Sequence, residues 1–211
     1  FNNDGNGNYT ELASKNIDTG MGLERLACVM QGVDSMFEVD TIKNIITAIS
    51  DKAGIKYHDD PKADISLRII ADHSRASAFL IADGVMPSNE GRGYVLRRLL
   101  RRACRHGKLL GIKGAFLSDI MAVVAHENLS AYPELTEKFD YISKIVSMEE
   151  ERFDANVEAG MNLLDTLTEK AKASGAKVLD GADVFKLSDT FGFPIDLTRE
   201  IAAERGLGID E

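Results

Sequence analysis

Gly93-Tyr-Val-Leu-Arg-Arg-Leu-Leu-Arg-Arg-Ala-Cys-Arg-His-Gly-Lys-Leu-Leu110 shows most clearly how this chain folds. Its apolar residues recur every three or four positions, which is typical of an amphipathic helix. Residues four apart lie on the same side of a helix, so the segment also has a basic face. That face carries Arg97, Arg101 and Arg105, with Arg98 and Arg102 beside them.

The charge around this segment is distributed unevenly. The chain has a net charge of −9, yet residues 92–113 contain eight Arg and Lys residues and no Asp or Glu. Like charges four residues apart repel, so the basic row needs a partner. Arginine forks suit phosphate oxygens, which favours a nucleic-acid backbone. The structural alternative is that carboxylates from neighbouring helices neutralise the row.

The remaining pattern predicts a mainly α fold. We expect helices over 22–31, 41–53, 65–83, 93–110, 115–128, 133–174, 182–187 and 195–205, with a strand or extended arm over 9–17. No apolar run approaches the roughly 20 residues of a membrane span, and the N-terminus resembles no targeting peptide. The two cysteines look like core residues of a reduced, cytoplasmic protein, and the histidines show no metal-ligand spacing.

A second informative segment is Asp18-Thr-Gly-Met-Gly-Leu-Glu-Arg25, which follows the short apolar-polar stretch 16–18 that suggests a strand. Gly20 and Gly22 would let a flat ligand lie against bare backbone at the start of a helix. Arg25 would then place a charged planar fork near a phosphate or a purine ring. When no other motif supports it, such a turn is more often simple chain geometry.

This segment closely resembles the third signature motif of the class II aminoacyl-tRNA synthetases, in the form found in the alanyl family. The resemblance implies ATP binding by Gly20, Gly22 and Arg25. It also implies alanine binding by Asp18 and Gly20, with Asp18 holding the amino group. ATP and Mg²⁺ would serve the whole enzyme, and neither is expected on this segment alone.

Later segments resemble the tRNA-recognition domain of the same family, in the same order. They are Ile70-Ala-Asp-His73, Phe79–Arg98 with its Pro-Ser-Asn loop, Glu149-Glu-Glu-Arg-Phe153, and Asp189-Thr-Phe-Gly-Phe-Pro-Ile-Asp-Leu-Thr198. The resemblance implies that Asn89 and Asp189 read a G·U pair in the acceptor stem of tRNA(Ala). It also implies that five arginines of the predicted basic helix contact the same RNA: Arg97, Arg98, Arg101, Arg102 and Arg105. Spacing alone favours structural roles, in which Asn89 closes a turn after Pro87 and Asp189 caps the helix after Pro194 or bonds locally.

The resemblance implies two domains and a function. Residues 1–35 would be a strand-helix remnant of the antiparallel-sheet catalytic domain, and residues 36–211 a helical tRNA-recognition domain. The chain would be an internal part of an alanine–tRNA ligase, inactive alone, with no membrane or DNA partner. Ser188 and Phe191 depart from the tyrosines common in the family. The alternatives are a stand-alone helical RNA-binding module and a helical scaffold.

Overall fold

The computed structural model describes residues 1–191, 193 and 195–210, apart from the side chains of residues 155–159 and 196. The chain divides into two compact units, Phe1–Val39 and Asp40–Glu211, which are described separately. The division of the chain into a catalytic remnant and a recognition domain stays a prediction.

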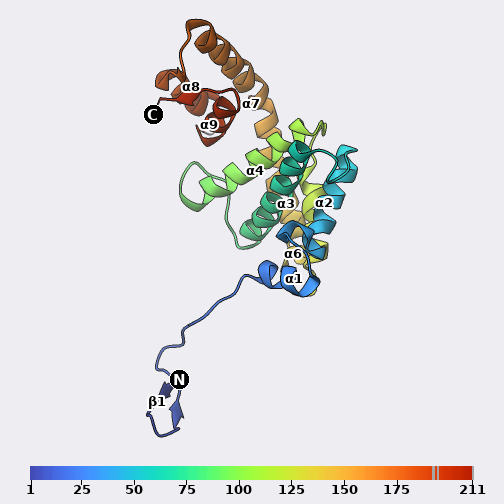
Figure 1. The fold of residues 1–211 in the computed structure, drawn as a ribbon, viewed down its shortest axis with the longest axis vertical. Coiled ribbons are helices and arrows are strands. Elements are labelled where there is room, and N and C mark those ends of the chain that lie inside the picture. Colours follow the sequence, from blue (N-terminus) through green and yellow to red (C-terminus); the bar gives the residue numbers. More distant parts are fainter. Residues whose placement is uncertain (192, 194, 211) are drawn as a thin grey trace. The chain divides into compact units, whose positions relative to one another are not determined.

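The first unit is small and has little regular structure. Strands β1 (Asn2–Asn3) and β2 (Tyr9–Thr10) pair antiparallel, and helix α1 (Leu23–Gln31) is followed by the 3-10 turn η1 (Met36–Glu38). Figure 1 shows the extended segment between the hairpin and α1. Of the strand or extended arm expected over 9–17, only β2 is regular strand, and Ile17 near its end is 92% exposed.

The second unit is built from packed helices. They are α2 (Asp40–Ala53), α3 (Pro61–Ala82), α4 (Gly91–Leu109), α5 (Leu117–Glu127), α6 (Glu134–Glu137), α7 (Phe139–Ser174), α8 (Gly181–Phe191) and α9 (Ile195–Glu204). Strands β3 (Val178–Leu179) and β4 (Gly208–Ile209) form a short parallel pair. The mainly α fold predicted from the sequence is therefore confirmed.

Helix α7 connects two groups of helices in the second unit. Its N-terminal half packs with α3, α4 and α5, while its C-terminal part carries α8, as Figure 1 shows. The core between α2, α3, α4 and α5 is formed by fully buried aliphatic side chains, among them Ile46, Leu67, Ile70, Leu96 and Ile120. Burying such side chains is the main favourable contribution to folding. One long helix thus supports both ends of the unit.

Two of the helix boundaries that differ from the expectation lie at identifiable contacts. Helix α3 begins at Pro61 rather than 65 because Asp60 caps it: its carboxylate accepts from the Lys62 N–H at 2.9 Å, and proline suits the first helical position. The expected helix 133–174 is divided into α6 and α7 at Lys138. The ammonium group of Lys138 donates to the Ala82 carbonyl at 2.7 Å, at the end of α3.

Candidate functional site

Helix α4 places Arg97 and Arg101 against a buried carboxylate of α7. The Arg101 Nε donates to Oε1 of Glu149 at 2.8 Å, and the Arg97 Nε lies 3.2 Å from the same oxygen. Glu149 is only 3% exposed and Arg101 only 7%. The Arg101 guanidinium also stacks over the Phe153 ring, 5.7 Å from its centroid. Both arginines therefore take part in the packing of α4 on α7.

The next arginines of α4 pair with α9. The Arg102 guanidinium lies 3.2 Å from Glu200, and Arg105 donates to Glu204 at 2.7 Å. The pKa of Glu200 falls to about 2 because His106 and the guanidinium groups of Arg102 and Arg105 stabilise its charge, against the opposing effect of burial. The His106 Nε2 lies 3.8 Å from Glu200, which is beyond hydrogen-bond distance.

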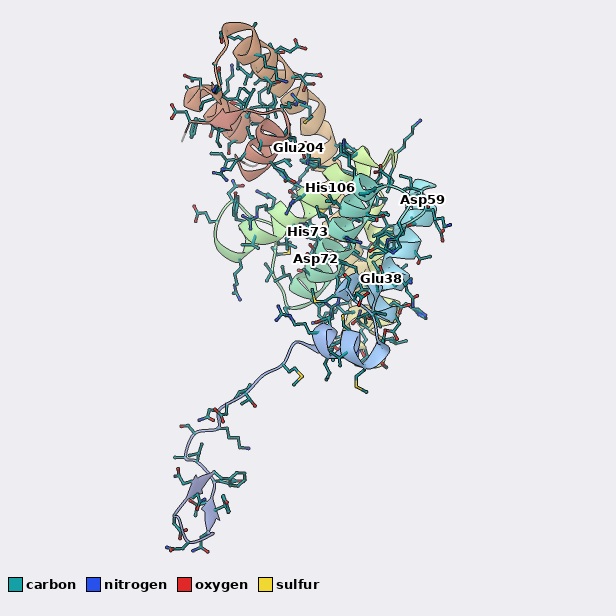
Figure 2. The ribbon with its side chains drawn as sticks, in the orientation of Figure 1. Glu38, Asp59, Asp72, His73, His106 and Glu204 are labelled. Carbon is teal, nitrogen blue, oxygen red and sulfur yellow. The ribbon has the colours of Figure 1, made fainter. Side chains whose placement is uncertain are left out.

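A cavity of about 680 Å³ opens beside these pairs, lined by α3, α4 and α9. Its basic side chains are Arg98, Arg101, Arg102, Arg199 and His73, and Glu200 is the acidic one. Figure 2 labels His73 and its neighbour Asp72 on α3. The Asp72 carboxylate is hydrogen-bonded to the His73 Nδ1 at 2.8 Å, and this hydrogen bond lowers the pKa of the Asp72 carboxyl. The excess of cations along its wall suits an anionic ligand.

The accessible arginines of α4 are a minority of the predicted five. Arg98 is exposed, and 39% of the Arg102 side chain is exposed. The Arg97 side chain is 19% exposed, and those of Arg101 and Arg105 are 9% exposed. The carboxylate pairs are those that the structural alternative predicted. Among the five predicted arginines, these pairs leave Arg98 and Arg102 the most accessible to a phosphate.

Asn89 lies in the loop between α3 and α4, and the loop is held firmly against α4. The Arg97 Nη1 donates to Oδ1 of Asn89, and its Nη2 donates to the Pro87 carbonyl at 3.4 Å. A Cβ on Gly93 would lie 2.2 Å from the Ser88 Oγ, so only glycine permits this approach. Asn89 itself is exposed. The loop thus presents a fixed amide side chain to solvent.

Asp189 occupies a different element. It is exposed in the last turn of α8, a helix that packs on α7 and α9, and Ser188 and Phe191 beside it are half-buried. Gly192 and Pro194 of the same sequence motif lie outside the described residues, as does the Asp196 side chain. Asn89 therefore lies in the loop that leads into α4 and Asp189 in the last turn of α8, and both helices pack on α7.

The glycine-rich motif lies in the first unit. Gly22 is the N-cap of α1, and a Cβ there would be 3.3 Å from the Arg25 side chain, which folds back over it. Asp18, Gly20, Gly22 and Arg25 are all exposed. Apolar side chains of the same helix are exposed as well, including Leu23 at 65% and Val29 at 77%. The motif forms an open strip rather than a closed pocket.

Several groups that shape the site carried no assigned role in the sequence analysis. Glu149 and Glu150 are both 3% exposed, and Glu150 accepts from the Phe116 N–H at 2.9 Å at the start of α5. The sequence does contain a signal that these carboxylates are buried. They lie three or four residues from Val146 and Phe153, on the apolar side of the predicted helix. A carboxylate on a buried face requires a cation or N–H partner.

The described residues offer neither a metal-ion cluster nor a membrane-spanning helix. They contain no group of three or more His, Cys, Asp or Glu side chains placed to hold a metal ion. None of the helices described is both long and apolar enough to cross a membrane.

Comparisons with known proteins find relatives that match the whole length of the chain. The family described as tRNA synthetases class II (A) matches residues 1–211. Alanine–tRNA ligase of Clostridioides difficile is 57% identical over 211 residues, which is 100% of this chain and 24% of that protein. Alanine–tRNA ligase 1 of Lachnoclostridium phytofermentans and the alanine–tRNA ligase of Acetivibrio thermocellus are each 54% identical over the same span. The chain thus covers 24% of the length of these relatives.

Proposed function

Because the chain belongs to the class II (A) family of tRNA synthetases, we propose that it is the part of an alanine–tRNA ligase that contains the third motif of the catalytic domain and the tRNA-recognition domain. The whole enzyme would activate alanine with ATP to an adenylate and transfer alanine to the terminal adenosine of tRNA(Ala). The observation that carries this proposal is the match over the whole chain to alanine–tRNA ligases at 53% to 57% identity.

In this proposal the first unit supplies one wall of the activation site. Gly20, Gly22 and Arg25 would contact ATP, and Asp18 with Gly20 would hold alanine. Their open placement in the unit is consistent with a wall completed by further residues of the enzyme. Mg²⁺ would accompany ATP in the whole enzyme, and no residue of this chain is assigned to it.

The second unit would bind the acceptor stem. Asn89 and Asp189 are proposed to read its G·U pair from the minor-groove side, which is the readable face of an RNA helix. The Asp189 carboxylate can accept from a guanine amino group, and the Asn89 amide can donate to a base or ribose oxygen. Both side chains are exposed, and α8 and the helix that follows the Asn89 loop, α4, both pack on α7.

The arginines of α4 would have two kinds of role in RNA binding. Arg98 and Arg102 line the 680 Å³ cavity and are proposed to contact phosphates directly. Arg97, Arg101 and Arg105 are proposed to serve the same RNA from within the ion pairs that join α4 to α7 and α9. Phosphate contacts set affinity and position without reading sequence.

Direct binding tests this proposal. The chain is titrated with two acceptor-stem RNA hairpins that differ only in a G·U or G·C pair, over a series of salt concentrations. We expect tighter binding to the G·U hairpin and an affinity that falls steeply with salt, because phosphate contacts release counterions. Equal affinity for both hairpins would overturn base-pair reading, and no binding at low salt would overturn RNA recognition by this unit.

The activation half has its own test. Alanine-dependent pyrophosphate exchange is measured with the full-length ligase that contains these residues and with the 211-residue chain. We expect exchange from the ligase and none from the chain, because the four motif residues form one wall only. Exchange by the purified chain would contradict the assignment.

A further inference from the structure

Asn89 is held in one orientation by a side chain that belongs to the scaffold. The Arg97 guanidinium reaches back from the second turn of α4 to the loop, where it donates to Asn89 Oδ1 and to the Pro87 carbonyl. An arginine has five N–H donors and no acceptor. The atom of the Asn89 amide that faces it must therefore be the oxygen. The amino group Nδ2 is then directed away from Arg97, as a hydrogen-bond donor.

The loop around Asn89 has further points of attachment. The Ser88 hydroxyl donates to the Glu90 carbonyl at 2.8 Å, and Gly93 lets the Ser88 side chain and the Met86 carbonyl pack directly on the first turn of α4. The backbone beneath Asn89 is therefore fixed as well as its side chain. Fixing a reading group in advance reduces the ordering cost of binding.

Arg97 is itself fixed from the opposite side. Its Nε lies 3.2 Å from Oε1 of Glu149, which is 3% exposed on α7 and also binds Arg101 at 2.8 Å. The charge of Glu149 is thus shared between two arginines of successive α4 turns. An exposed amide is connected through a single guanidinium to a buried carboxylate of the helix that also supports α8.

We propose that Arg97 is a positioning residue: held by Glu149, it turns Asn89 so that the amide presents its N–H groups to the base pair. This inference rests on the proposed role of Asn89 in reading the G·U pair. Its consequence is specific, because loss of Arg97 removes the orientation of a reading group. Loss of Arg98, the neighbouring exposed arginine, removes charge without touching that orientation.

The test compares Arg97→Gln with the charge-matched control Arg98→Gln. Affinity for the G·U and G·C hairpins is measured for each variant, with circular dichroism to follow folding. We expect Arg97→Gln to reduce the G·U preference by roughly 10-fold, the scale of one mismatched base pair. We expect Arg98→Gln to weaken binding to both hairpins by the same factor. A folded Arg97→Gln variant that keeps the full preference would overturn the inference.

Two further variants keep the test decisive. Arg97→Lys retains the charge beside Glu149 but lacks the fork, so we expect it to fold and to lose preference in the same direction. In an Asn89→Ala background, Arg97→Gln should have no additional effect on the preference, because coupled residues are not additive. An undiminished additional effect would show that Arg97 acts by another route.

The outcomes also separate this inference from the proposed function. If Asn89→Ala keeps the G·U preference, the reading role of Asn89 fails. If Asn89→Ala loses the preference while folded Arg97→Gln and Arg97→Lys keep it, only the positioning role fails. A crystal structure of the chain with the G·U hairpin gives a direct check on the wild type: we expect Asn89 Oδ1 to face Arg97, and the reversed amide would contradict the inference.

Discussion

Arg101 and Glu149 form a buried ion pair in which the Arg101 Nε donates to the Glu149 Oε1 at 2.8 Å. Removing one partner of such a pair leaves an uncompensated charge in the core, which costs about 3–5 kcal/mol. We therefore expect Glu149→Gln to lower the free energy of unfolding by about that amount, measured by urea denaturation.

The matched control lies on the same helix. Asp154 pairs with Lys108 at 2.7 Å, but both side chains are about two-fifths exposed. Exposed pairs contribute about 0–1 kcal/mol, so Asp154→Asn should have a small effect. Equal effects of the two substitutions would show that the Arg101–Glu149 pair has no special structural role.

Gly93 gives a prediction whose sign is opposite to that of an ordinary helical glycine. Replacing glycine by alanine within a helix usually stabilises it by about 0.5–1 kcal/mol. Here the new Cβ would lie 2.3 Å from the Met86 carbonyl oxygen, which is backbone and cannot swing aside. We expect Gly93→Ala to destabilise by about 1–3 kcal/mol. Arg92→Ala, at the exposed neighbouring position, is the control, and thermal denaturation of both compares them.

Glu200 predicts a pH dependence. Its folded pKa of about 2 is below the ordinary 4.5, so its ionised form stabilises the fold. That contribution is complete above about pH 5 and is lost as the pH falls from about 5 to about 2. Glu200→Gln should therefore flatten the fall in stability across this range. Glu151→Gln, on the exposed side of α7, controls for the lost charge, and a wild-type slope in Glu200→Gln would contradict the prediction.

The two cysteines should differ sharply in reactivity. Burial raises the pKa of the Cys104 thiol well above its usual range, and the residue is 3% exposed. The thiolate is the reactive form, so Cys104 should react with a thiol reagent only in denaturant. Cys28 is half-buried on α1 and should react in the folded chain. Cys28→Ser is expected to abolish the native-state reaction, and a persisting fast phase would locate it at Cys104.

The sequence predicted helices well where periodicity and caps agree. The sequence predicts a helix over 93–110, and α4 spans Gly91–Leu109. The agreement is close because the apolar and basic residues keep the helical spacing along the whole segment. The start of α3 was misplaced because Asp60 and Asp64 are both plausible caps. In the structure Asp60 is the cap, while Asp64 lies within the helix and accepts from the backbone N–H of His58, six residues earlier, at 2.8 Å.

The partners of the basic row could not be assigned from the sequence. Arg101 and Glu149 are 48 residues apart, and Arg105 and Glu204 are 99 apart. Only the packing of α7 and α9 on α4 brings them together. The arginine periodicity therefore indicated a shared face, but not which side chains of that face are buried. Exposure, which separates Arg98 from Arg101, is a property of the folded unit.

The central claim is that Asn89 and Asp189 read one base pair, and aminoacylation by the full-length ligase that contains these residues tests it most directly. The kcat/KM is measured for tRNA(Ala) with a G·U or a G·C pair at the recognised position, for Asn89→Ala, Asp189→Ala and the neighbouring controls Glu90→Gln and Thr190→Ala. We predict that Asn89→Ala and Asp189→Ala each reduce the G·U preference by roughly 10-fold or more, while the controls keep it. Folded Asn89→Ala and Asp189→Ala enzymes that retain the full G·U preference would contradict the account.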